Sequence, residues 1–524
     1  MLLLALSIEV LAAISDLPPL KPIIQGMRAL WQDGILPHDI QVSGARWLIG
    51  WSIGITIGTC LGILTGRSRP IRYSLEGFLA LCRAIPFISL LPLAIRLFGL
   101  SETKALFLVA WACALTCWVI THQTAQLLPA QLKWRAVSLG LPRRTWILRI
   151  LVPSCADGIQ VALRTSLALG LIVVAIAEMS GVYERSSGLW WSEGIGYRLF
   201  QSLDAGKDDL LLASILTFTG MGIAADQLFV IAWAGTRGVA YRIRRRAVRR
   251  LVARAPHTLD IGVRAWLPPE AVELTVSEAR YNGKHVIDGL SLSVGAGETL
   301  VVIGESGCGK TTLIRSIANL ADESFHVERR LKIGDEEVTV AGSWAGIVLQ
   351  EAPVFGHLTV WDNIAIVGRI RGESREYQTR AVWDLLTEFG LTSAAEQRAN
   401  TLSGGQRQRL SLAATLASGP RLLLLDEPFG ALDALTRRRL QDFYIRHIAG
   451  RITAVFVTHD LHEALRVGNV IRIGVDRQSP VVHVDNRGVS PKEWEQDSAF
   501  LRLQNRLVEL LEADSADPQR PSAA

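Results

Sequence analysis

A nine-residue string in the second half of the chain has the spacing of a loop that binds phosphate groups. It matches G-x-x-x-x-G-K-[ST], follows an apolar run and precedes a helix-like segment. The glycines permit a tight turn that points successive backbone N–H groups at phosphates, and the helix adds the positive end of its dipole. Lys310 is expected to contact the terminal phosphates, and Thr311 to offer its hydroxyl to Mg²⁺. The loop consists of Gly304, Glu305, Ser306, Gly307, Cys308, Gly309, Lys310, Thr311 and Thr312.

Two further strings narrow the chemistry, because a phosphate loop alone does not separate kinases from GTPases. The leucines at 422–425 are typical of a buried strand, which ends in two carboxylates, Asp426 and Glu427. The second carboxylate is suited to orient and polarise an attacking water. The string LSGGQ at 402–406 opens a helix whose N-terminal amides and Ser403 hydroxyl can present a second phosphate site.

Composition divides the chain into an apolar part and a soluble part. Of 524 residues, 49% are hydrophobic, and the mean hydropathy of +0.27 is high for a soluble ATPase. The six cysteines have no metal or disulfide spacing, so we expect reduced, buried thiols. Membrane spans are predicted at 43–66, 75–99, 103–128, 158–182 and 208–234, each near the roughly 20 residues that a bilayer requires.

The first fifteen residues admit three interpretations: a short or tilted sixth span, an interfacial helix, or a span that starts upstream. They are short for a span, and Glu9 interrupts them. They also lack the basic start and the small-residue cleavage site of a secretory signal. We favour the short or tilted span.

Basic residues gather in alternate connections between the predicted spans. Eight arginines and no acidic residue lie between Arg237 and Arg254, directly after the last span. A nucleic-acid-binding tail would have a similar composition, but this position favours anchoring of the span at the inner membrane surface. The pattern predicts a cytoplasmic phosphate-loop domain, contact with the lipid membrane and no nucleic-acid partner.

The cytoplasmic connection at 131–153 has the features of a docking knob. Apolar residues at helical spacing lead to Gly140 and Pro142, and a second amphipathic helix is predicted to end at Pro153. Two short helices joined by a Gly-Leu-Pro turn could fit a groove on a cytosolic domain. A loop that rests on lipid headgroups would explain the basic residues equally well.

The membrane half resembles a known class of transport protein. The segment 131–153 is similar to the EAA coupling loop of bacterial ABC importers. The usual acidic start of that loop is absent at 134–137. Outside the loop, Arg96 stands where this importer family usually has an apolar residue. The resemblance to permeases of the nitrate, sulfonate and taurine importer family covers 82–100, 135–154 and 162–181.

The second half resembles an ABC ATPase, and the resemblance implies roles for its motif residues. Asp426 would help to hold Mg²⁺, Glu427 would activate water, and His459 would contact the γ-phosphate. Gln350 would sense Mg²⁺ and the coupling loop, and Lys310 would serve hydrolysis as well as binding. The other residues implied at the nucleotide are Tyr281 on adenine, Asp433 at the dimer interface, and Ser403, Gly404, Gly405 and Gln406 of the signature.

In the ABC family the signature meets the γ-phosphate that the other protomer holds. The resemblance therefore implies a homodimer with ATP and Mg²⁺ as cofactors, and an active ATPase because no hydrolysis motif is missing. The expected fold is an α-helical transmembrane domain like a type I ABC importer, followed by an α/β RecA-like domain with a helical subdomain. The expected parts are a permease domain at 1–236, a basic segment and linker at 237–270, an ATPase domain at 271–490, and a C-terminal helix with a disordered tail at 491–524.

The resemblance implies an ATP-driven importer in a bacterial cytoplasmic membrane, supplied by a separate extracytoplasmic binding protein. The expected solute is a small organic or inorganic oxyanion of the sulfonate, taurine or nitrate type. Import of a vitamin or pyrimidine-type precursor, an exporter, and a regulatory ATPase without transport remain alternatives. Arg96 and Arg164 lie near or within spans, where charge is costly and often functional, and Glu178 could close a gate by hydrogen bonding.

Alkylation of Cys308 should inhibit ATP hydrolysis, because this thiol lies beside the expected phosphates. The helix N-terminus and Lys310 favour its reactive thiolate form. We expect bound nucleotide to protect Cys308, as measured by mass spectrometry of the labelled peptide alongside phosphate release. Full hydrolysis after complete alkylation of Cys308 would contradict this prediction.

Overall fold

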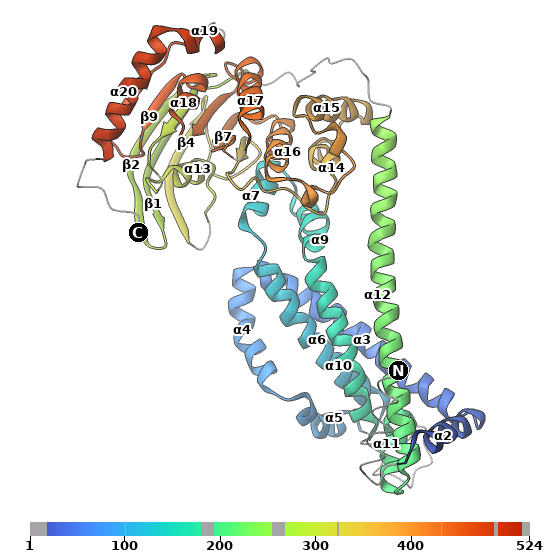
Figure 1. Cartoon of the computed structure of the whole chain (residues 1–524). Coiled ribbons are helices and arrows are strands. Elements are labelled where there is room, and N and C mark those ends of the chain that lie inside the picture. The colour runs from blue at the N-terminus through green and yellow to red at the C-terminus, as the bar shows by residue number, and fades with distance from the viewer. Residues whose placement is uncertain are drawn as a thin grey trace. The chain divides into compact units, whose positions relative to one another are not determined.

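The chain divides into two units, each with its own core (Figure 1). The computed structural model describes residues 18–99, 101–179, 193–253, 268–305, 307–321, 324–430, 432–486 and 491–515. The membrane unit takes the described residues up to 128 and those from 151 to 241, and the α/β unit takes 129–150 and those from 242 onward. The first fifteen residues, residues 254–267 of the expected basic segment and linker, and the end of the tail lie outside the described residues.

The described secondary structure of the membrane unit is helical. Four helices, α3, α6, α10 and α12, are long and apolar enough to cross a membrane, and they coincide with four of the five predicted spans. The helices are α2 (Leu20–Gln32), α3 (Ile35–Arg67), α4 (Arg69–Ala84), η1 (Phe87–Leu90), α5 (Leu91–Phe98), α6 (Glu102–Gln126), α9 (Val152–Ser154), α10 (Ala156–Met179), α11 (Ile195–Asp204) and α12 (Asp208–Val252).

The predicted span at 75–99 is a bent pair of helices and not one straight helix. The chain bends by 91° between Pro70–Ala84 and Phe87–Phe98. Ile85 stands before Pro86, and the proline ring disfavours helical backbone at the preceding residue. Ile85 accordingly has φ −85° and ψ 114°, so α4 ends there.

The second helix of the cytoplasmic connection ends within one residue of the predicted Pro153. Its helical turns begin at Arg143, include a π-helical stretch at Trp146–Leu151 and end at Ser154. Proline lacks an N–H group and crowds the preceding turn of a regular α-helix, so an end at this point is expected.

α3 packs on the backbone of α6 along a stripe of glycines spaced four residues apart. A Cβ atom on Gly54 would lie 2.6 Å from the carbonyl oxygen of Ala110, and one on Gly58 would lie 2.2 Å from that of Ala114. Small residues in this pattern let membrane helices approach closely. The stripe consists of Gly50, Gly54, Gly58, Gly62 and Gly66.

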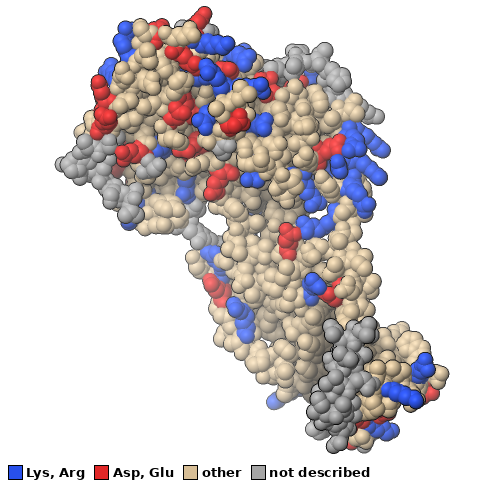
Figure 2. All heavy atoms as spheres, viewed as in Figure 1, with Lys and Arg blue, Asp and Glu red and all other residues tan. Residues whose placement is uncertain are grey.

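α12 carries the basic segment that the sequence places after the last span, and it continues that span as one helix. Within the α/β unit, arginines of its last turns pair with acidic side chains, and Lys and Arg gather over this region in Figure 2. These ion pairs attach the end of α12 to the domain that follows it. They join Arg244 to Asp362, and Arg245 and Arg249 to Glu396.

The α/β unit is built on two sheets. One has the strand order β10-β9-β3-β8-β7-β6, in which β9, β3, β8, β7 and β6 are parallel, and the other is antiparallel with the order β2-β1-β4-β5. The strands are β1 (Val272–Tyr281), β2 (Lys284–Val294), β3 (Thr299–Ile303), β4 (Phe325–Ile333), β5 (Glu336–Glu337), β6 (Ala345–Val348), β7 (Leu422–Asp426), β8 (Thr453–Val457), β9 (Val470–Ile473) and β10 (Val481–His483).

Helices and two hydrophobic cores complete the α/β unit. One core joins α13 to both sheets, and the other joins α14, α15, α16 and α17 to the parallel sheet. The C-terminal helix packs on the α/β unit, with Phe500 and Leu507 in the second core. The helices are α7 (Ala130–Ser138), α8 (Arg143–Thr145), α13 (Lys310–Ala318), α14 (Val360–Ile370), α15 (Arg375–Glu388), α16 (Gly404–Ala417), α17 (Ala434–His447), α18 (Leu461–Val467), α19 (Pro491–Gln496) and α20 (Ser498–Ser515).

Gly58→Ala should destabilise the membrane unit, because the new methyl group would meet the α6 backbone. Overpacking of this kind costs about 1–3 kcal/mol of unfolding free energy, although alanine favours a helix more than glycine does. The matched control is Gly220→Ala on α12, where an added Cβ meets nothing within 4 Å. Thermal unfolding in detergent should show a lower midpoint for the first variant only, and equal midpoints would contradict the predicted helix contact.

Candidate nucleotide site

The phosphate loop lies between β3 and α13, where the sequence predicts it. Gly307 and Gly309 have φ angles of +91° and +96°, which side-chain-bearing residues rarely adopt. The Lys310 ammonium group donates to the carbonyl oxygens of Gly304 and Glu305 at 2.7 and 2.6 Å. These bonds hold the positive charge inside the curve of the loop.

Of two further residues of the phosphate loop, the structure describes Cys308 but not Ser306. Cys308 is partly buried, and its Sγ atom lies 4.0 Å from Nζ of Lys310. The thiol is therefore next to the loop's cation, as expected. Ser306 lies outside the described residues.

Asp426 ends β7 next to the start of α13. Its side chain is buried, and it forms a hydrogen bond with the Thr311 hydroxyl. Burial raises the pKa of Asp426 and the Glu427 charge raises it further, whereas the Thr311 bond and the Lys310 charge lower it; the net pKa is above its ordinary value. A carboxylate beside a hydroxyl offers the oxygen ligands that Mg²⁺ prefers, so the pair fits the expected metal.

The carboxylate of Glu427 is contacted by Gln350 and His459, which are far from it in the sequence. Gln350 Nε2 donates to Oε2 at 3.2 Å, and Nδ1 of His459 lies 3.1 Å from Oε1. Gln350, Glu427 and His459 follow β6, β7 and β8, which are neighbours in the parallel sheet. The carboxyl ends of adjacent parallel strands lie at one edge, so the sheet itself brings these side chains together.

The backbone of Glu427 is held in an uncommon conformation. Its φ angle is +46°, in the left-handed region that residues with side chains rarely adopt. The amide donates to the carbonyl of Val457 at 2.9 Å, and the carbonyl accepts from Gln408 Nε2 at 3.0 Å. Strained backbone of this kind persists where the surroundings fix it, and it often marks a functional residue.

The signature string forms the N-terminus of α16, as expected, and it closes a capping box. The Ser403 hydroxyl accepts from the Gln406 amide at 3.3 Å, while the Gln406 side chain accepts from the Ser403 amide at 3.0 Å. Ser403 and Gly404 are exposed. Helix α16 belongs to the second core and α13 to the first, so the two phosphate-binding motifs are built on different cores.

Two more of the implied nucleotide residues lie at the edges of elements. Asp433 caps α17 by accepting from the Thr436 amide at 3.0 Å, and this bond lowers the pKa of Asp433. Tyr281 ends β1 with 41% of its surface exposed, and the Arg315 guanidinium lies 5.4 Å from its ring centroid. One face of the ring is thus held by a cation–π contact.

Residues 129–150 pack against the α/β unit, which favours the docking knob over a loop that only rests on lipid. Ala136, Leu139 and Ile150 form an apolar cluster with Phe355 and Ile366. Gly140 has φ +69°, which gives the expected turn after α7. The cluster includes Phe355, which follows Gln350 closely, so the knob contacts the segment that leads from the carboxylate site at Glu427.

Arg135 is a buried cation in this contact. Nη1 donates to the Ser411 hydroxyl at 2.7 Å, and the guanidinium lies 5.6 Å from the Phe355 ring centroid. Among the described residues, Nε and Nη2 have no hydrogen-bond partner. Burial lowers the pKa of Arg135 to about 10.

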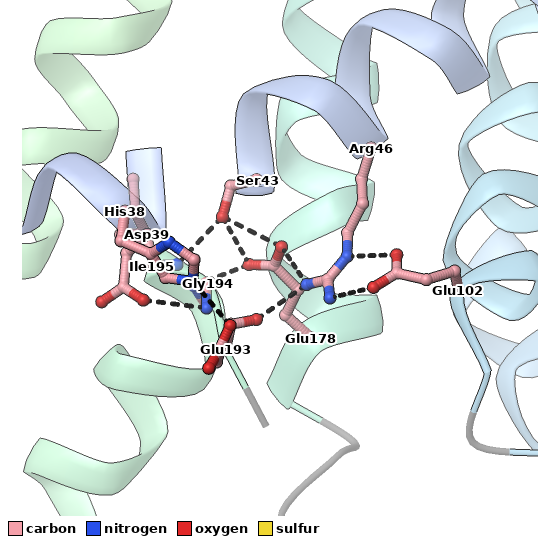
Figure 3. A network of polar contacts seen from close by, with 10 residues as sticks. His38, Asp39, Ser43, Arg46, Glu102, Glu178, Glu193, Gly194 and Ile195 are labelled. Carbon is pink, nitrogen blue, oxygen red and sulfur yellow. Dashed lines mark hydrogen bonds and ion pairs between the residues drawn. The ribbon is translucent and has the colours of Figure 1, made fainter. Parts of the chain in front are cut away.

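At the other end of the membrane helices, a polar network centres on Arg46 and Glu178 (Figure 3). Arg46 lies between the carboxylates of Glu102 and Glu178, at 2.5 and 2.9 Å. Glu178 also accepts from Ser43 and from the Gly196 amide, both at 2.9 Å. These bonds join α3, α6, α10 and the start of α11, and a closing role of Glu178 stays a prediction.

Residues that the sequence reading did not single out account for much of this geometry. Arg46 and Ser43 lie inside a predicted span, and an ionisable residue at such a position is a recognisable signal. Arg164, which the sequence places near or within a span, forms two hydrogen bonds with Asp226 at 2.6 and 2.7 Å. No sequence motif marks its partner, which lies in another helix.

Comparison with known proteins gives two family matches along the chain. Residues 54–233 match the family described as the inner membrane component of binding-protein-dependent transport systems. Residues 287–430 match the family described as ABC transporter.

Curated relatives match less than half of the chain. The "Sulfate/thiosulfate import ATP-binding protein CysA" of Bordetella parapertussis is 43% identical over 206 residues, which are 38% of this chain and 58% of that protein. Its namesake from Xylella fastidiosa strain Temecula1 is 40% identical over 243 residues, 44% of this chain and 67% of that protein. A solved ATP-binding cassette, dimeric and bound to ADP and phosphate, is 24% identical with a TM-score of 0.37, covering 41% of this chain and 99% of its own.

The matches follow the division seen in the structure. The permease match covers apolar helices of the membrane unit, so the chain is a multi-pass inner-membrane protein whose nucleotide-binding domain lies in the cytoplasm. The ABC match covers the phosphate loop, the signature and the strand that ends at Asp426. The chain therefore belongs to the ABC transporters, and it carries permease and ATP-binding parts in one polypeptide.

Proposed function

We propose that two copies of this chain form an ATP-driven importer of a small solute. The observation that carries the proposal is the meeting of Gln350, Glu427 and His459 at one edge of the sheet, in a chain that also holds a permease. The packing of 129–150 beside the segment after Gln350 supports coupling of hydrolysis to transport.

The residues present suit hydrolysis of ATP bound at the phosphate loop. Glu427 would accept a hydrogen bond from the attacking water, and His459 and Gln350 would hold the carboxylate in place. Thr311 and Asp426 would hold Mg²⁺, with Gln350 as a further ligand, and the ion would neutralise charge on the phosphates. Lys310 would exchange its bonds with loop carbonyls for bonds with phosphate oxygens.

A dimer supplies what one chain lacks. The exposed signature at Ser403 and the phosphate loop lie on different cores, so one chain provides two half-sites. Two chains in opposite orientation would complete two sites, with Asp433 near the interface. Closure of these sites on ATP would favour one of two membrane-unit conformations, and hydrolysis would release it.

We propose an oxyanion as the solute, delivered by a separate extracytoplasmic binding protein. The names of the curated relatives, which refer to sulfate and thiosulfate import, support this class. Sulfonate, taurine and nitrate belong to the same class. A vitamin or pyrimidine-type precursor and an export activity are the alternatives that an experiment must separate.

ATP hydrolysis in lipid nanodiscs, with and without extracytoplasmic proteins from the native source, tests this function. A binding-protein-dependent importer should hydrolyse faster with the extract, and fractionation would then identify the protein and its solute. Steady hydrolysis that no fraction stimulates would favour an exporter or a regulatory ATPase.

Glu427→Gln should lower ATP hydrolysis by about 10²-fold or more, because an amide polarises water poorly. ATP binding should persist, and the closed dimer should accumulate. Phosphate release and crosslinking of the dimer measure the two effects. Glu328→Gln, an exposed carboxylate change on β4, is the control; wild-type turnover in Glu427→Gln would contradict the assignment.

A further inference from the structure

Two cavities in the membrane unit lie side by side along α6, and they share Arg83 and Val119 as wall residues. The inner cavity has a volume of about 240 Å³, and the middle cavity about 340 Å³. The inner cavity is lined in part by Thr65, Arg72, Glu76, Arg83, His122 and Gln126. The middle cavity is lined in part by Ile85, Pro86, Phe87, Ala112, Thr116 and Leu169.

The two cavities follow α6 from its middle to its cytoplasmic end. Ala112 lies near the middle of α6, and Gln126 ends the helix just before the segment that packs on the cytoplasmic domain. The fourteen residues between them correspond to a rise of about 21 Å. The outer end of the same helix, at Glu102, is joined to α3 by the network of Figure 3.

The middle cavity lies at the break between α4 and α5. Pro86 causes this break, and the two helical segments meet at 91°. Broken helices near the membrane centre are a common setting for solute sites, because irregular backbone is tolerated where it lines a cavity. Arg83 stands in the last turn of α4, directly before the break.

Arg83 is a charged residue in the walls of both cavities, and no described residue pairs with its side chain. Its side chain is exposed, and it makes no hydrogen bond or ion pair with another described residue. A charge at this depth is costly against lipid, so such residues face water-filled space or protein. Arg164 differs, since Asp226 engages it, and Arg96 lines neither cavity.

His122 adds a second polar group with a defined tautomer. The Thr65 hydroxyl donates to the Leu61 carbonyl at 2.7 Å, so its oxygen accepts from Trp118 Nε1 and from His122 Nδ1, each at 2.9 Å. The proton of the neutral ring therefore sits on Nδ1. Nε2 is left to accept a hydrogen bond, or to bind a proton when an anion approaches.

From this geometry we propose that the two cavities are the inner part of the solute path and that Arg83 binds a small oxyanion there. The guanidinium can present two parallel N–H groups to two oxygens of such an ion. Each cavity far exceeds the ~10–15 Å³ that one water requires, so the ion can keep part of its hydration. The inference rests on the proposed import function, and it gives that function a solute site.

Charge-selective labelling of a cysteine at 116 tests the site without ATP turnover or a binding protein. The Thr116→Cys variant in nanodiscs is treated with an anionic or a cationic methanethiosulfonate reagent, and mass spectrometry follows labelling at residue 116. The anionic reagent should react faster, and Arg83→Gln should reduce this preference by roughly fivefold, as expected for loss of one nearby charge.

Two variants serve as controls for the role of charge at Arg83. Arg83→Lys should keep most of the preference, which separates loss of charge from a folding defect. Arg96→Gln removes a cation of the same bent segment that lines neither cavity, and it should leave the preference unchanged. Equal rates for both reagents in the Thr116→Cys protein, or no labelling by either, would overturn the proposed path.

Inorganic sulfate is the probe for the ion class. At equal ionic strength, sulfate should slow anionic labelling of the Thr116→Cys variant more than chloride does, and Arg83→Gln should abolish the difference. Equal effects of sulfate and chloride would overturn the oxyanion site. If sulfate protects selectively but no extracytoplasmic protein stimulates hydrolysis, the site is retained and the import function is rejected. If an extracytoplasmic protein stimulates hydrolysis but sulfate and chloride act equally, only the site is rejected.

Discussion

A carboxylate that activates water must be held in one orientation, and we propose this role for Glu427. The structure holds Glu427 through a left-handed backbone, fixed by main-chain bonds, and through Gln350 and His459 on its two oxygens. All three residues follow neighbouring parallel strands. A shift of one strand would therefore disturb the whole arrangement, and the segment after Gln350 is also the one that residues 129–150 contact.

The membrane unit uses α6 as its common element. The glycine stripe of α3 fixes one face of α6 at backbone contact, a network around Arg46 joins its outer end, and the two cavities follow its inner half. Close packing on one side leaves little freedom there, whereas the broken pair α4 and α5 is held by fewer contacts. Movement that opens the path would therefore be expected at the α4–α5 side.

The local geometry of the nucleotide motifs could be predicted because each motif is a short string of adjacent residues. Gly307 and Lys310 are examples, since turn, charge and helix start are adjacent in the sequence. The break at Ile85 was missed because the apolar pattern continues across Pro86, although a residue before proline is a boundary signal. The glycine spacing of α3 was visible but could not identify α6 as its partner. Arg83 and His122 became interpretable only when packing placed them on one cavity.

We propose that each ATP site combines the phosphate loop of one chain with the signature of the other. Two differently tagged chains, one with Lys310→Ala and one with Ser403→Arg, should be co-expressed and purified through both tags. Each homodimer lacks an intact site, but the mixed dimer would recover one, so its ATP hydrolysis should clearly exceed that of either homodimer. A mixed dimer as inactive as both homodimers would show that a site does not draw on two chains, and it would contradict the account.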